Sequence, residues 1–133
     1  MNELERSQIK MLNRMSSEDA ATWLMTEYPI DSPGYGVAIK LLAHKSWKKS
    51  DQLRLARYYF QKIPFASIKT YEVFASFMSI PSFLGVVKEY IPTEKNKLDL
   101  LLYYLRPVLE GRVRRVSDAK LVERFLDDLN DRK

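Results

Sequence analysis

Apolar residues recur every three or four positions along most of the chain, which is the spacing of one face of an α-helix. The clearest case is near the C-terminus, where a helix is expected to begin at Ser117 or Asp118. Its apolar stripe consists of Leu121, Val122, Phe125, Leu126 and Leu129. Evidence for strands is thin, because the β-branched residues are scattered and no alternating run of strand length lies between turn signals. The pattern predicts an all-α protein.

The remaining predicted helices are mostly short, and only a few residues separate one from the next. A serine, threonine or aspartate stands at the start of most of them, where its side chain can accept a hydrogen bond from a backbone amide of the first turn. The expected helices cover residues 3–15, 16–28, 37–42, 50–63, 67–78, 81–90 and 93–111. With the last one, we expect seven or eight helices in a single domain that covers residues 1–133.

Three aromatic-rich runs stop on a proline, at Pro29, Pro64 and Pro92. Proline has no amide hydrogen and clashes with the preceding turn, so each one marks the end of a helix. Such regular endings suit helix pairs that stack as in a repeat protein. However, the intervals are unequal and few positions match. A compact repeat-like stack and an irregular orthogonal bundle therefore both stay open.

Two expectations concern individual helices. In the segment 50–63, the apolar face is expected to consist of residues spaced by three, four and three positions, namely Leu53, Ala56, Phe60 and Ile63. In the segment 93–111, Pro107 is expected to kink or end the helix, because it cannot donate the helical hydrogen bond.

The composition excludes several kinds of catalytic and metal-binding site. The chain has no cysteine and a single histidine, His44, so disulfides, thiolate zinc sites, cysteine nucleophiles and multi-histidine metal sites are excluded. A lone histidine needs an orienting carboxylate to act as a general base, and none lies close to His44 in sequence before Asp51. No phosphate-binding loop or nucleophile motif is present. We expect a protein that is not an enzyme, with no catalytic residue, metal or cofactor.

The N-terminus carries no targeting signal that we recognise. It has neither a basic head nor an apolar core, so it does not resemble a secretory signal. No apolar run approaches the roughly 18 residues that a membrane-spanning helix needs. The expectation is a cytoplasmic protein that does not enter a membrane.

Positive charge is concentrated in one part of the chain. The formal net charge is +5, yet residues 36–70 carry eight basic side chains and a single acidic one, Asp51. Residues 1–35 are acidic by comparison. The basic residues that could form one ridge are Lys40, Lys45, Lys48, Lys49, Arg54, Arg57 and Lys62. Such a ridge is typical of proteins that bind an acidic protein or a nucleic acid, although a merely solvated face is the alternative.

Aromatic residues accompany this charge. Trp47 stands among lysines, where it could anchor a partner, or it could fold back to close the core. Neighbouring positions on a helix point about 100° apart, so the pairs Tyr58–Tyr59 and Tyr103–Tyr104 cannot both face one core. We therefore expect one tyrosine of each pair at the boundary or on the surface, and Tyr58 is a candidate contact residue.

A second basic cluster is expected between the last two helices. It contains Arg112, Arg114 and Arg115. Arginine recognises phosphate or carboxylate groups with two parallel hydrogen bonds. The alternative is that these arginines neutralise the acidic C-terminal residues Asp127 and Asp128.

These observations predict a small binding module that acts by stoichiometric occupation of a macromolecular partner, as an inhibitor, an immunity or antitoxin-like protein, or an adaptor. The expected partner is a protein with an acidic surface; nucleic acid is the alternative, and self-association is compatible with both. The predicted contact residues are Lys45, Trp47, Lys48, Lys49, Arg54, Arg57, Tyr58, Arg112, Arg114 and Arg115.

Overall fold

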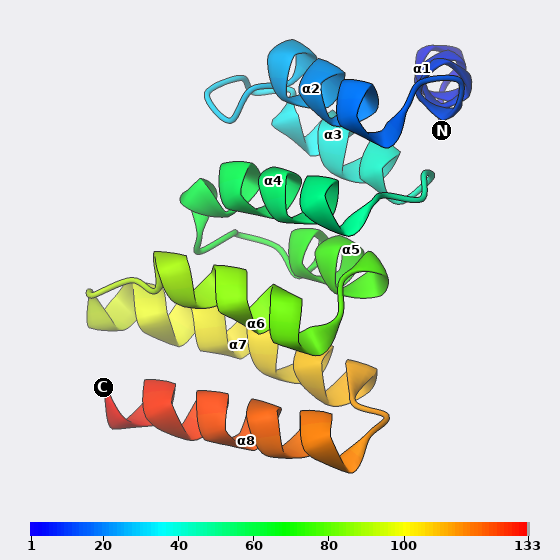
Figure 1. Cartoon of the computed structure of the whole chain (residues 1–133). Coiled ribbons are helices and arrows are strands. Elements are labelled where there is room, and N and C mark those ends of the chain that lie inside the picture. Colours follow the sequence, from blue (N-terminus) through cyan, green and yellow to red (C-terminus); the bar gives the residue numbers. More distant parts are fainter. Residues whose placement is uncertain (133) are drawn as a thin grey trace. The chain divides into compact units, whose positions relative to one another are not determined.

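The computed structural model describes residues 1–132 and confirms the all-α fold class (Figure 1). Within these residues there are eight α-helices, two short 3₁₀ helices and no strand. The chain divides into two compact units, Met1–Tyr59 (unit 1) and Phe60–Lys133 (unit 2). The single domain over residues 1–133 stays a prediction.

Unit 1 contains two pairs of helices. Helix α1 contacts α3, and α2 contacts α4, so each helix packs against the helix two places further along the chain. This is the arrangement of stacked helix pairs. The helices are α1 (Glu3–Asn13), α2 (Ser17–Glu27), α3 (Tyr35–Leu42) and α4 (Lys49–Tyr59).

The polar residues that precede the first two helices cap them. The Asn2 side chain accepts a hydrogen bond from the Glu5 amide at 2.8 Å, and the Ser16 hydroxyl accepts one from the Asp19 amide at 3.0 Å. Each bond satisfies an amide that has no partner inside its helix. The predicted cap of α2 is therefore confirmed, and this helix ends just before Pro29, as expected.

The buried face of α4 differs from the predicted one. Leu55, Ala56 and Tyr59 are buried, whereas Leu53 is only half-buried. The helix ends at Tyr59, and its buried face begins at Asp51, which is 3% exposed. The prediction considered only apolar residues, so it could not align the face on a buried aspartate. The predicted face is therefore wrong at Leu53 and Ile63, which are half-buried. It is right at Ala56 and Phe60, which are buried.

Unit 2 repeats the packing pattern of unit 1, and its last two helices are the longest of the described residues. Helix α5 contacts α7, and α6 contacts α8, while neighbouring helices within each pair also contact each other. Both units thus support the stack of helix pairs over an irregular bundle. The elements are η1 (Phe60–Lys62), α5 (Lys69–Phe77), α6 (Ile80–Val87), η2 (Lys88–Tyr90), α7 (Lys95–Arg112) and α8 (Val116–Asp131).

Phenylalanine rings form the centre of unit 2. The Phe60 ring packs edge-on against Phe65, Phe74 and Phe83, with centroid distances of 6.2, 4.9 and 5.8 Å. This is the favoured geometry for aromatic pairs. Helix α8 covers the core with the predicted stripe, of which Val122, Phe125, Leu126 and Leu129 are buried.

Pro107 does not end α7, which continues to Arg112. Pro107 leaves the carbonyl of Tyr103 without its helical amide partner. Both residues are exposed, so water can hydrate that carbonyl and the helix continues. Gly111 accordingly lies inside the last turn and does not close the helix.

Candidate partner-binding surfaces

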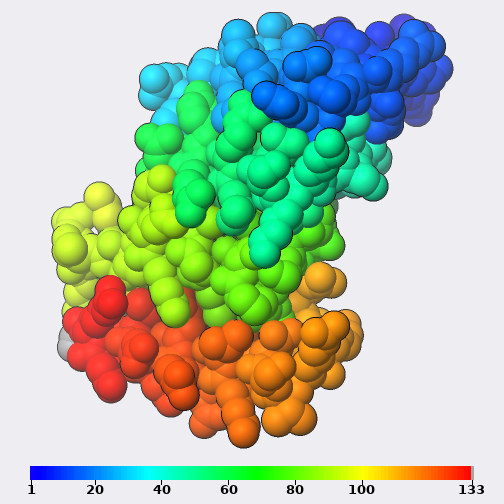
Figure 2. All heavy atoms as spheres, in the orientation of Figure 1, coloured from blue at the N-terminus to red at the C-terminus, as the bar shows by residue number. Residues whose placement is uncertain are grey.

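Helix α4 presents basic side chains on its exposed side. Arg54 and Arg57 are three residues apart and share the face opposite the buried Leu55. Lys48 and Lys49 are exposed where the helix begins, and neither forms an ion pair within residues 1–132. We call Lys48, Lys49, Arg54 and Arg57 the α4 surface. The segment is visible in teal and green in Figure 2.

Arg54 also contributes to the structure of unit 1. Its Nη1 lies 3.1 Å from Asp51 Oδ1, and its Nη2 donates to the Thr22 hydroxyl of α2 at 2.8 Å. Asp51 is nearly fully buried, so this pairing compensates a carboxylate that would otherwise be costly to bury. Arg54 therefore joins α2 to α4, and Asp51 offsets part of its charge.

Trp47 is a core residue, which was the alternative interpretation of this position. It is 6% exposed, and its Nε1 donates to the Leu42 carbonyl at 3.0 Å. Lys45 Nζ donates to the Met15 carbonyl at 3.0 Å and lies 5.9 Å from the centre of the Trp47 ring. Both predicted contact residues thus have internal partners, and the Trp47 ring is not presented to solvent.

The tyrosine pair of α4 links this helix to the end of α2. Tyr59 is buried and donates to the Tyr28 carbonyl at 3.0 Å and, more weakly, to the Leu24 carbonyl at 3.3 Å. Burial, with a smaller contribution from Tyr58, raises the pKa of the Tyr59 hydroxyl. The Tyr58 hydroxyl accepts from the Ile30 amide at 3.0 Å, and its ring is half-buried. One tyrosine of this pair thus lies at the boundary, as predicted. In the other pair Tyr103 lies on the surface, with 72% of it exposed, so the prediction is confirmed there as well.

A hollow of about 410 Å³ lies where α2 and α4 of unit 1 begin. Two basic and two acidic side chains line it, so their charges balance and the hollow does not favour an anion. The lining residues are Ser16, Glu18, Lys48, Ser50, Asp51 and Arg54.

In unit 2 the second basic cluster lines a pocket of about 370 Å³, which we call the arginine pocket. The beginning of α6 and the connection between α7 and α8 lie at the same end of the unit (Figure 1). The cluster lies between two helices, as predicted, but the residues opposite it were not foreseen. The lining residues are Met78, Ser79, Ile80, Pro81, Arg112, Arg114, Arg115 and Asp118.

The backbone of the connection turns Val113 away from the neighbouring arginines. Val113 (φ −66°, ψ 126°) is extended, and side chains alternate along an extended chain. Val113 accordingly lines a groove on the other side, while Arg112 and Arg114 line the arginine pocket. Arg115, the N-cap residue of α8, also lines this pocket. Arg114 Nη1 donates to the carbonyls of Gly111 and Val113, both at 2.9 Å.

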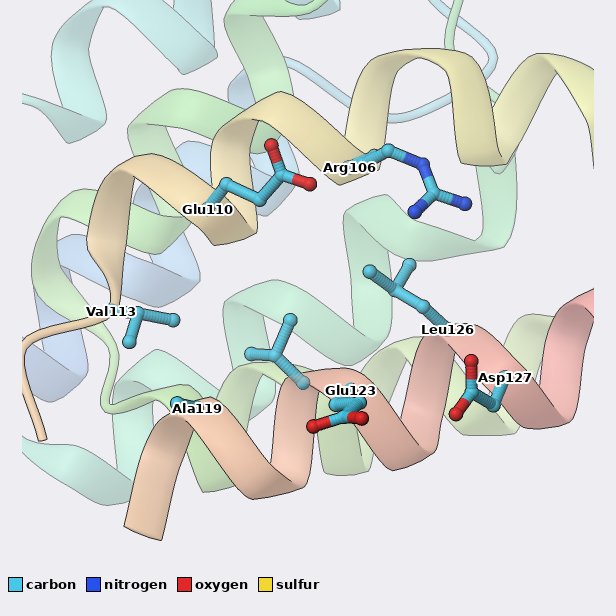
Figure 3. Close-up of a pocket in the computed structure, with 8 residues that line it drawn as sticks. Arg106, Glu110, Val113, Ala119, Glu123, Leu126 and Asp127 are labelled. Atoms are coloured by element: carbon cyan, nitrogen blue, oxygen red, sulfur yellow. The ribbon is translucent and has the colours of Figure 1, made fainter. Parts of the chain in front are cut away.

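The groove on the other side of the connection separates α7 from α8 and has a volume of about 400 Å³. Figure 3 shows Arg106 and Glu110 on α7, facing Glu123, Leu126 and Asp127 on α8. Three carboxylates and one arginine surround an apolar floor, so the groove is acidic. No pattern along the chain indicated this groove, because Val122 and Leu126 of its apolar floor belong to the stripe that was assigned to the core. The lining residues are Arg106, Glu110, Val113, Ala119, Val122, Glu123, Leu126 and Asp127.

His44 is exposed at the end of α3, and its side chain forms no hydrogen bond within the part of the chain that the structure describes. In the same residues, no group of three or more histidine, cysteine, aspartate or glutamate side chains is placed to hold a metal ion. No helix among residues 1–132 is both long enough and apolar enough to span a bilayer.

Comparison of the chain with known protein families, curated proteins and solved structures finds no significant match. Inferences about function therefore rest on the surfaces of the chain itself.

Proposed function

We propose that the protein is a non-enzymatic binding module that acts by stoichiometric occupation of another protein with an acidic surface. An inhibitor, an immunity or antitoxin-like protein, and an adaptor all act in this way. The observation that carries the proposal is the α4 surface. Four basic side chains lie within residues 48–57 and are exposed, whereas the only acid of this segment, Asp51, is buried.

The charge of this surface resides mainly in its lysines. Asp51 offsets part of the charge of Arg54, but no carboxylate within residues 1–132 pairs with Lys48 or Lys49. Unpaired surface charges attract an oppositely charged partner over roughly a Debye length, which is about 8 Å at physiological ionic strength. The lysines should therefore raise the rate of association more than they slow dissociation.

The experiment uses the full chain as bait in three forms: wild type, K48A/K49A and the control K10A/R14A. The control removes the same charge from exposed positions elsewhere in unit 1. A partner that depends on the α4 surface is retained by the wild type and the control and is depleted by K48A/K49A. Its association rate with K48A/K49A should be lower by about fivefold or more at about 50 mM salt, with a flatter salt dependence. Equal retention by all three forms would reject the proposal.

Nucleic acid is the alternative partner. The exposed arginines of the arginine pocket favour it, since guanidinium groups suit phosphates. The acidic character of residues 1–35 counts against it. Binding to a DNA or RNA backbone weakens steeply as salt rises, so retention of duplex DNA or RNA on a filter should be strong at low salt and weak at high salt. No retention at low salt removes this alternative.

A further inference from the structure

We propose that the arginine pocket of unit 2 binds a phosphate monoester. The pocket brings Arg112, Arg114 and Arg115 to one end of the unit, opposite the residues that begin α6. This site lies in a different unit from the α4 surface and does not depend on the proposed protein partner.

The charges that line the pocket favour the binding of an anion. Three guanidinium groups face one carboxylate, Asp118, and neither Arg112 nor Arg115 forms an ion pair within residues 1–132. A phosphate monoester carries a charge of about −1.5 to −2 at pH 7, which matches the excess of the lining charges. A carboxylate carries only one negative charge and would leave part of that excess unmatched.

The local structure prepares donors for such a ligand. Arg114 uses Nη1 for the carbonyls of Gly111 and Val113, which fixes its guanidinium group and leaves the donors on Nε and Nη2. Arg115 stands at the N-cap of α8, whose first turn has no side-chain cap within the described residues. The positive end of the helix dipole adds to the attraction for an anion there.

The size and the walls of the pocket indicate an ester in preference to bare phosphate. A volume of about 370 Å³ lies within the range of small-molecule sites. Met78, Ile80 and Pro81 provide an apolar wall for the organic part. The hollow where α2 and α4 begin carries balanced charges, and the groove between α7 and α8 is acidic, so neither offers the same setting for an anion.

The test is calorimetric titration of the full chain with inorganic phosphate, phenyl phosphate and acetate at an ionic strength of about 20 mM, where screening is weak. Four proteins are compared: wild type, R112A/R115A, D118N and the control K120A/R124A. The control removes two exposed positive charges from α8 outside the pocket. R112A/R115A should lower the affinity for phenyl phosphate about tenfold or more, and D118N should raise it about threefold. The control should change it less than about twofold.

Three results would overturn the site: no heat of binding with either phosphate, equal losses in R112A/R115A and K120A/R124A, or acetate binding as tightly as phosphate. Circular dichroism of each variant verifies that it is folded. A short peptide that carries one phosphotyrosine identifies the source of the ester. Tighter binding of this peptide than of phenyl phosphate assigns the ester to a modified protein, and equal or weaker binding assigns it to a small molecule; both results support the site.

Discussion

The two units use their polar and aromatic residues in opposite ways. In unit 1, polar side chains hold helices together: Arg54 bonds to Thr22, Lys45 bonds to the Met15 carbonyl, and Tyr59 bonds to the end of α2. In unit 2, packed phenylalanine rings form the core. Within residues 1–132, Arg112 and Arg115 form no hydrogen bond or ion pair through their side chains, and Arg114 bonds only to its own connection.

This difference teaches that a dense run of basic residues is not the same as an available positive surface. Residues 36–70 hold the greatest excess of positive charge in the sequence, but several of these side chains have structural partners. The smaller cluster at Arg112, Arg114 and Arg115 surrounds a pocket with a single acid. The following experiments test this contrast, from the largest expected effect to the smallest.

Replacing Phe74 with alanine should cause the largest loss of stability. Phe74 is fully buried and packs against Phe60, so its removal leaves a cavity in the core of unit 2. The expected cost is about 3–5 kcal/mol in the free energy of unfolding. Urea unfolding followed by circular dichroism measures it. Phe77→Ala is the control, because Phe77 is half-buried and should cost clearly less; equal costs would contradict the ring-packed core.

Arg54→Ala should destabilise unit 1 by about 1–2 kcal/mol, because it leaves the buried Asp51 carboxylate without its arginine partner. Both tryptophans, Trp23 and Trp47, belong to unit 1, so urea unfolding followed by tryptophan fluorescence reports on this unit. Arg112→Ala removes the same kind of side chain from the arginine pocket of unit 2, so its unfolding is followed by circular dichroism, and it should change stability by less than about 0.5 kcal/mol. Similar costs for the two variants would abolish the distinction between structural and available arginines.

Tyr59→Phe should lower the free energy of unfolding by about 1 kcal/mol, since it removes one hydroxyl that bonds to two carbonyls at the end of α2, one buried and one partly buried. The same fluorescence-detected unfolding measures this change. Tyr103→Phe is the matched control on an exposed tyrosine of unit 2 and should have no measurable effect on urea unfolding followed by circular dichroism. An unchanged free energy of unfolding in Tyr59→Phe would show that these hydrogen bonds contribute nothing to the stability of unit 1.

The smallest effect concerns alkaline pH. Burial raises the pKa of Tyr59 in the folded protein, so the unfolded chain releases this proton first as the pH rises. The contribution of Tyr59 to the free energy of unfolding is therefore complete below the pKa of the unfolded chain, about 10, and decreases above it. Between about pH 9 and about pH 11, the free energy of unfolding of the wild type should fall by about 1 kcal/mol more than that of Tyr59→Phe. If the free energies of unfolding of the two proteins changed in parallel with pH, this would contradict the burial of the Tyr59 hydroxyl.

The fold class followed from the sequence because helical periodicity and capping residues are local signals. The stripe of α8, the Ser16 cap and the stop before Pro29 were all predicted correctly. Errors arose where distant parts of the chain decide the outcome. The buried Asp51 is paired with Arg54, which in turn bonds to Thr22, 32 positions away on α2.

The candidate sites were predictable only in part for the same reason. Charge density drew attention to both basic clusters, and Arg112, Arg114 and Arg115 do lie together. Their convergence with the start of α6 comes from the packing of α6 against α8, which no pattern along the chain reveals. Likewise, the internal bonds of Lys45 and Tyr58 join residues about 30 positions apart.

The central claim is that the arginine pocket binds a small anion, whereas the hollow beside the α4 surface carries balanced charges and does not. Nitrogen–proton NMR spectra of the full chain during titration with phenyl phosphate test it most directly, because each backbone amide reports its own surroundings. The account predicts saturable shifts confined to residues 78–81 and 111–118, with only weak, non-saturating shifts at 48–57. Shifts of equal size and no saturation in both regions would contradict it.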